Sequence, residues 1–131
     1  MYRSHTLSSH IVKTAILLTL VMAFAVGMTS PAMALSAKKK KIVKIIRTVA
    51  KAKHLSKSET KALLKIAKME SGYRPTARNH SCKGLFQLMT HKSRSKWANA
   101  KWNTAKAIKY IKHRYGSVHA ALKFHYAHGW Y

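Results

Sequence analysis

The sequence of 131 residues predicts an all-α fold. Beyond residue 35, apolar side chains recur every three to four positions in several stretches, which is the period of an amphipathic helix. Ser and Asn residues that favour helix starts precede these stretches, and Gly follows them. No stretch alternates apolar and polar side chains as a half-buried strand does, and no internal repeat is visible. We therefore expect helices packed around one core.

Residues 1–34 have the composition of a secretory signal peptide. A basic start precedes the apolar residues 14–26, and Ala32-Met33-Ala34 has the small-residue pattern of a cleavage site. An uncleaved membrane anchor is the alternative, but the apolar run is shorter than the roughly 20 residues that a spanning helix needs. We expect cleavage after Ala34 and a secreted or cell-wall location.

The charge of the chain is strongly one-sided. There are 26 Lys and Arg residues against two Glu and no Asp, a formal charge of +24. Loss of Arg3 and Lys13 with the signal peptide leaves 24 basic residues against two acidic ones, or +22. Such a charge attracts polyanions within a Debye length. For an exported protein we expect anionic wall polymers or lipid head groups as partners, in preference to nucleic acid.

Residues 35–55 predict a basic amphipathic helix. Residues 38–41 are four lysines, and an apolar stripe with helical spacing follows them: Ile42, Ile45, Ile46 and Val49. A basic helix of this kind can lie on a membrane surface. It can also pack on the rest of the domain with its lysines in solvent, and the narrow stripe favours this second interpretation.

A second helix is predicted to start at Ser56 and to carry both carboxylates of the protein. Ser56 and Glu59 have the spacing of a capping box, in which each side chain is expected to accept from the other residue's backbone N–H. The helix runs to Glu70, where Gly72 and Pro75 end it. Glu59 and Glu70 are 11 residues apart, or roughly 16 Å along a helix, so they cannot share one substrate bond.

The remaining chain predicts a loop and three more helices. Residues 74–83 are polar and suit an exposed loop, and the apolar residues 84–89 follow it. Residues 93–98 suit a short helix with Trp97 turned inward. The last two predicted helices have these boundaries: Asn103 caps residues 104–115, Gly116 ends them, and Ser117 caps a final helix before Gly129. Residues 56–131 are therefore expected to form one domain.

Elimination leaves Glu70 as the main candidate for chemistry. His125 and His128 are three residues apart on the last helix, but no carboxylate or cysteine is placed to complete a metal site, and we expect no metal or cofactor. Without Asp, no Ser-His-Asp triad can form. Cys82 is the sole cysteine; it is conceivable as a thiolate nucleophile, but a tolerated loop cysteine is the simpler interpretation. A carboxyl group at a helix end suits a general acid.

Two ordered blocks carry a family resemblance. Residues 66–75 read IAKMESGYRP and residues 84–89 read GLFQLM. Together they resemble the catalytic core of the soluble lytic transglycosylase family, which is related to goose-type lysozymes. Residues 107–117 and the ending Gly-Trp-Tyr are similar to those of short secreted members from high-GC Gram-positive bacteria and their phages. The resemblance covers residues 62–131 and implies a lysozyme-like helical domain.

The resemblance also implies an activity and a set of site residues. The activity is cleavage of the β-1,4 bond between N-acetylmuramic acid and N-acetylglucosamine in peptidoglycan glycan strands, with Glu70 as the catalytic acid. Ser71 corresponds to the neighbouring serine, and Asn79 or Ser81 stands in place of a loop serine. The substrate groove is implied to contain Gly84, Phe86, Gln87 and Met89. Either Tyr126 or His125 is expected to face the catalytic carboxyl group, because Ala127 stands where the family usually has Asn after its tyrosine.

The carboxylate count bears on the mechanism. Most glycosidases use two carboxylates, and only Glu70 is available here. A single Glu can protonate the glycosidic oxygen and then accept the proton of the C6 hydroxyl of the same muramic acid, which closes a 1,6-anhydro ring. Hydrolysis by a muramidase with a loosely held water is the alternative. Rival functions from other classes are a cationic antimicrobial or wall-binding protein and a nucleic-acid-binding module.

One electrostatic conflict yields a structural prediction. A general acid at neutral pH needs a raised pKa, yet the surrounding positive charge lowers the pKa of a carboxyl group. Burial must therefore dominate around Glu70. We expect Glu70 to lie against Phe86, Met89 and an aromatic residue of the last helix, with no Lys or Arg beside it.

Overall fold

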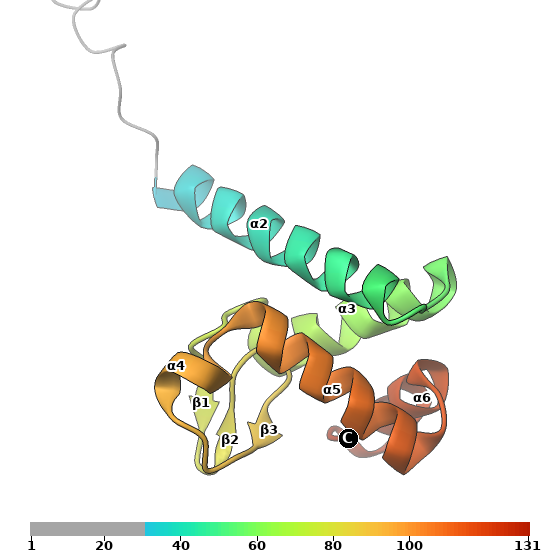
Figure 1. Cartoon of the computed structure of the whole chain (residues 1–131). Helices are drawn as coiled ribbons and strands as arrows, with labels where there is room; N and C mark the ends of the chain where they lie inside the picture. Colours follow the sequence, from blue (N-terminus) through green and yellow to red (C-terminus); the bar gives the residue numbers. More distant parts are fainter. Residues whose placement is uncertain (1–30) are drawn as a thin grey trace, which may run out of the picture. The chain divides into compact units, whose positions relative to one another are not determined.

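The computed structural model describes residues 31–131 (Figure 1). The chain divides into two units between Ala34 and Leu35, and residues 35–131 form the unit that is described in full. The predicted signal peptide therefore lies outside the described residues, apart from its last four, which begin the first described helix. In the part of the chain from residue 31 onward, no helix is both long and apolar enough to cross a membrane.

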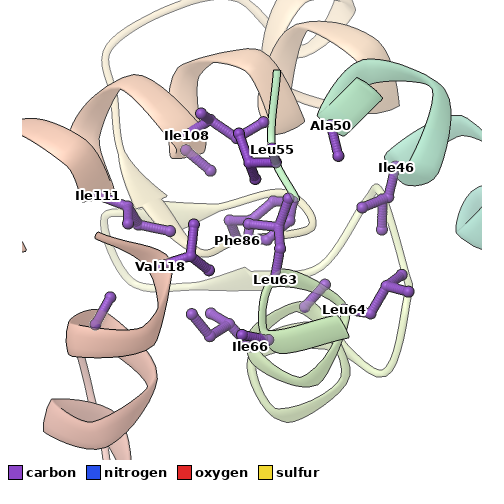
Figure 2. Packing of buried hydrophobic residues seen from close by; sticks show 14 of the residues in the cluster. Ile46, Ala50, Leu55, Leu63, Leu64, Ile66, Phe86, Ile108, Ile111 and Val118 are labelled. Carbon is purple, nitrogen blue, oxygen red and sulfur yellow. The ribbon is translucent and has the colours of Figure 1, made fainter. Parts of the chain in front are cut away.

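The described chain is mostly helical, as predicted. Its elements follow in this order: α2 (Pro31–Ala52), α3 (Lys57–Ser71), β1 (Arg78–Asn79), β2 (Cys82–Lys83), β3 (Leu88–Met89), α4 (Arg94–Trp97), α5 (Ala100–Tyr115) and α6 (Val118–His128). Helix α6 contacts both α3 and α5, and α4 contacts α5. One hydrophobic core joins side chains from α2, α3, α5 and α6 with the loop that holds Phe86. Figure 2 shows Phe86 and Leu63 among these side chains.

Helix α2 contributes to this core with one narrow face. Ile46 and Ala50 are fully buried, and Val49 is nearly so. Residues 38–41, the four lysines, are exposed. The apolar stripe therefore packs as the core interpretation predicted.

Helix α3 begins and ends as predicted. The Glu59 backbone N–H donates to Ser56 Oγ over 3.1 Å, and the Ser56 N–H donates to Glu59 Oε2 over 2.9 Å. The Ser56 backbone N–H holds the pKa of Glu59 below its usual value, because it donates to the carboxylate and stabilises its charge. Gly72 ends the helix in the left-handed conformation, with φ of 57°. The capping box gives Glu59 a structural role.

Replacing Ser56 with Ala is expected to lower the stability of the domain. The change removes the acceptor for the Glu59 N–H, and the loss of an N-cap side chain costs about 1 kcal/mol. In a domain of this size that corresponds to a fall in Tm of about 4–8 °C in a thermal unfolding experiment. Ser81→Ala changes an exposed turn residue and is the control, with an expected Tm close to that of the wild type.

The middle of the chain contains three short strands that the sequence did not predict. Strands β1, β2 and β3 form a small antiparallel sheet in that order, with Asn79 opposite Cys82 and Cys82 opposite Met89. The predicted exposed loop, residues 74–83, contains the first two strands. Each strand has two residues, too few for any alternation to be visible in the sequence.

The start of α5 was also predicted wrongly. Asn99 is the N-cap, and its side chain accepts from the Trp102 N–H over 3.0 Å. Asn103, the predicted cap, lies inside the helix and is completely buried. The other boundaries are confirmed: Gly116 ends α5, and Ser117 caps α6. Trp97 is buried, as expected.

Candidate active site

A cleft of about 1330 Å³ runs beside the C-terminal end of α3. Its walls come from three parts of the described chain: the end of α3, the segment that contains the small sheet, and α5 together with the last residues. The residues that line it include Met69, Glu70, Asn79, Phe86, Gln87, Met89, Trp102, Tyr110, Arg114, Trp130 and Tyr131. Residues that are distant in sequence thus share one surface.

Glu70 lies in this cleft in the last turn of α3, directly before Ser71 and the Gly72 cap. Its side chain is 15% exposed, and that of His125, which comes from α6, is 10% exposed. His125 Nε2 lies 2.7 Å from Glu70 Oε1. The contact between α3 and α6 therefore places an imidazole against the carboxyl group.

The pKa of Glu70 is raised, as a general acid at neutral pH requires. Burial raises the pKa of Glu70 above 4.5, and this effect exceeds the lowering by the hydrogen bond and the charge of His125. Among the described residues, the one ion pair of Glu70 is with His125, and no Lys or Arg bonds to it. Burial dominates over the surrounding positive charge.

Replacing His125 is expected to shift the pH dependence of any reaction in which Glu70 acts as an acid. Leu at this position removes both influences that lower the pKa of Glu70 and leaves the burial, so the pKa rises further. The protonated form of Glu70 then persists to higher pH, and the alkaline limb of the pH–rate profile shifts to higher pH. Rates measured across pH check this, with His128→Leu, an exposed residue of the same helix, as the control. An unchanged limb in His125→Leu would contradict it.

The predicted site residues divide into two groups. Glu70, Asn79, Phe86, Gln87 and Met89 line the cleft. Ser71, Gly84, His125 and Tyr126 are not among the lining residues, and His125 reaches the site through Glu70. The question of which side chain faces Glu70 has a clear answer, because His125 bonds to it whereas Tyr126 is 62% exposed.

Ser71 and Gly84 have structural positions. Ser71 is buried, and its hydroxyl donates to Leu85 O over 2.8 Å, which ties the end of α3 to the next wall of the cleft. Gly84 is buried and has φ of 85°. A Cβ on Gly84 would lie 2.7 Å from Trp97 O and 2.8 Å from Asn103 Cγ, so no side chain fits there. The space beside Gly84 is filled by the protein itself.

Asn103 stabilises the loop around Gly84 and Phe86, a role that the sequence did not predict. Its Oδ1 accepts from the Phe86 N–H over 3.0 Å, while its Nδ2 donates to Lys83 O and Trp97 O. Gln87 supports the same loop: its Nε2 donates to Gly84 O over 2.8 Å and to Ala77 O over 3.2 Å. These hydrogen bonds of the two side-chain amides fix Phe86 beside the cleft.

Tyr131 is a second residue that the sequence analysis left without a role. Its hydroxyl donates to Phe86 O over 2.6 Å, and its ring stacks against that of His125 with centroids 6.1 Å apart. Burial raises the pKa of Tyr131 well above 10.0, and the negative charge of Glu70 adds to the effect. The tyrosine therefore keeps its proton and supports His125. The ending Gly-Trp-Tyr was the one signal for it.

Metal-ligating and thiol side chains are the other groups of interest in the described residues. Within residues 31–131, no group of three His, Cys, Asp or Glu side chains is arranged to hold a metal ion. Cys82 is a free thiol, partly buried in strand β2 and on the wall of the cleft.

Fold and site together define a mostly helical domain with a wide cleft, in which burial favours the acid form of one carboxyl group. Comparisons of the chain with models of protein families, with curated proteins and with solved structures find no match.

Proposed function

We propose that the protein is a lytic transglycosylase, which cleaves the bond between N-acetylmuramic acid and N-acetylglucosamine in peptidoglycan. The observation that carries this proposal is the state of Glu70: a mostly buried carboxyl group with a raised pKa, held by His125 in an open cleft. A raised pKa is what a general acid needs near neutral pH. The resemblance of residues 62–131 to the transglycosylase family and a lysozyme-like fold are parts of the same proposal.

The hydrogen bond to His125 indicates which oxygen of Glu70 acts on the substrate. Oε1 is bonded to His125 Nε2, so Oε2 carries the transferable proton. In the proposed first step, Oε2 donates this proton to the glycosidic oxygen, and the bond from that oxygen to the muramic acid C1 breaks. The acetamide group of the same sugar stabilises the positive charge at C1.

The second step uses the same carboxylate as a base. Glu70 accepts the proton of the muramic acid C6 hydroxyl while the hydroxyl oxygen bonds to C1, which gives a 1,6-anhydro sugar and consumes no water. Glu59 cannot take part, because the capping box holds it at the opposite end of α3. The usual pair of carboxylates for hydrolysis is therefore missing, since these are the only two acidic side chains in the sequence.

The dimensions and charge of the cleft support a polymeric substrate. Pockets for small molecules usually have volumes of roughly 300–1,000 Å³, and this cleft has about 1330 Å³. Trp102, Tyr110 and Trp130 line it, and aromatic rings provide flat apolar surfaces on which sugar rings can stack. We propose a secreted protein that acts at the cell wall, where its +22 charge attracts anionic wall polymers.

The test is the release of soluble muropeptides from purified peptidoglycan from which other wall polymers have been removed. The proposed enzyme releases them in amounts that grow with time and exceed its own molar amount. A cationic antimicrobial or wall-binding protein is the second candidate, favoured by the exposed lysines at residues 38–41. Such a protein would bind the peptidoglycan and kill cells without releasing fragments.

A further inference from the structure

Arg114 is a fixed cation on the wall of the cleft, and the proposed reaction does not use it. It lies in the last turn of α5 and lines the cleft. No carboxylate side chain can neutralise it, because the two glutamates of the sequence are engaged by Ser56 and by His125. A guanidinium without an acidic partner is available for an anionic group of a ligand.

Three aromatic rings hold the Arg114 guanidinium in place. Its carbon lies 5.4 Å from the ring centroid of Trp130, 5.6 Å from that of Tyr115 and 5.9 Å from that of Tyr110. Each distance is within the range of a cation–π contact. Arg114 is exposed to solvent, and these contacts favour one position of its guanidinium before any ligand binds, which reduces the entropic cost of binding.

The same rings connect Arg114 to the proposed catalytic pair. Tyr110 packs edge-on against Tyr131 at 5.9 Å, and Tyr131 stacks on His125, the partner of Glu70. Two lysines of the same helix, Lys106 and Lys109, also line the cleft on this side. The α5 wall therefore offers positive charge and aromatic surface to a glycan strand that reaches Glu70.

We propose that Arg114 recognises the carboxylate carried on the lactyl arm of muramic acid, either free or at the end of an attached peptide. This proposal rests on the proposed function and adds a specificity to it. A polymer of N-acetylglucosamine has the same β-1,4 backbone and no carboxylate, so Arg114 distinguishes the two glycans. A planar guanidinium can donate two parallel hydrogen bonds to a carboxylate, which an amide side chain cannot do.

Binding of peptide-free glycan strands to the full-length protein with Glu70→Gln tests the proposal, because this background prevents cleavage during the measurement. The same strands with their lactyl carboxylates converted to neutral amides are the matched ligand, and strands that retain their peptides show which carboxylate is read. Adding Arg114→Gln is expected to weaken binding of the charged strands by about tenfold to a hundredfold, as the loss of a charge-assisted hydrogen bond does. Binding of the neutral strands is expected to stay within about twofold.

Arg94→Gln, which removes an exposed Arg outside the cleft, is the control for net charge and is expected to leave both affinities nearly unchanged. Arg114→Lys keeps the charge and is expected to retain part of the preference for charged strands. Equal losses for charged and neutral strands in Arg114→Gln, or no loss for either, would overturn the proposal. A wild-type protein that shows the preference but never cleaves would overturn the proposed function and leave this site in place.

Discussion

Glu70→Gln is expected to reduce peptidoglycan cleavage by about a thousandfold or more. General acid–base catalysis contributes roughly 10²–10⁴-fold, and here one group serves both steps. The change alters the large positive charge of the chain very little, so binding to anionic walls should persist. Release of soluble muropeptides by equal amounts of the two proteins measures the effect.

The same substitution is expected to leave the protein at least as stable near neutral pH. The folded pKa of Glu70 is raised, so ionisation favours the unfolded chain. Stability from the neutral carboxyl group is complete below the unfolded pKa of 4.5 and is lost as pH rises through the higher folded pKa. Gln removes that loss, and thermal unfolding at neutral pH should show a Tm no lower than that of the wild type.

Glu59→Gln is the matched control for the loss of a glutamate from α3. It weakens a charge-assisted bond of the capping box and is expected to lower the Tm while cleavage continues. Cleavage that survives Glu70→Gln, or that is lost equally in both variants, would contradict the role assigned to Glu70.

Gly84→Ala is expected to destabilise the domain by about 2–5 kcal/mol. The positive φ of 85° costs an L-residue about 1–2 kcal/mol, and forcing a methyl group against Trp97 O and Asn103 costs a further ~1–3 kcal/mol. Because small domains are stable by only about 5–15 kcal/mol, thermal unfolding should show a large fall in Tm.

Gly129→Ala separates the two contributions. Gly129 is in the left-handed region with φ of 77°, so Ala there has a similar backbone strain, but a Cβ meets no atom within 4 Å. Only the strain remains, so the expected cost is about 1–2 kcal/mol. Equal losses of stability in the two variants would show that Gly84 is not tightly packed against Asn103.

The sequence predicted what short-range interactions determine. The capping box at Ser56, the left-handed Gly72 and the cap at Ser117 each depend on residues within a few positions, and all three are confirmed. Helical periodicity likewise identified α3 and α6. Glu70 could be singled out because so few acidic residues compete with it.

The sequence could not show contacts between residues far apart in the chain. Asn is a residue type that favours helix N-caps, and only the hydrogen bonds of Asn103 to Phe86 and Lys83 show that it stabilises a loop. His125 lies 55 positions after Glu70, and the choice between it and Tyr126 depends on the rotation of α6. The family resemblance implied that Gly84 lies in the substrate groove, but the structure places the Asn103 side chain against it.

The positive charge of the chain and the burial of Glu70 have opposite effects on the pKa of this carboxyl group. The formal charge of +24 lowers the pKa of an exposed carboxyl group, whereas burial of Glu70 raises its pKa. The cationic residues Arg114, Lys106 and Lys109 line the same cleft without bonding to Glu70. The residues proposed to attract a polyanion are therefore different from those that bury Glu70.

The most direct test of the central claim is mass spectrometry of muropeptides released in water labelled with heavy oxygen. If Glu70 alone serves as acid and then as base, the C6 hydroxyl closes the ring, and the products carry 1,6-anhydro-muramic ends without the label. Products with free reducing ends that contain one labelled oxygen would show that water attacks C1, and would contradict the proposed mechanism.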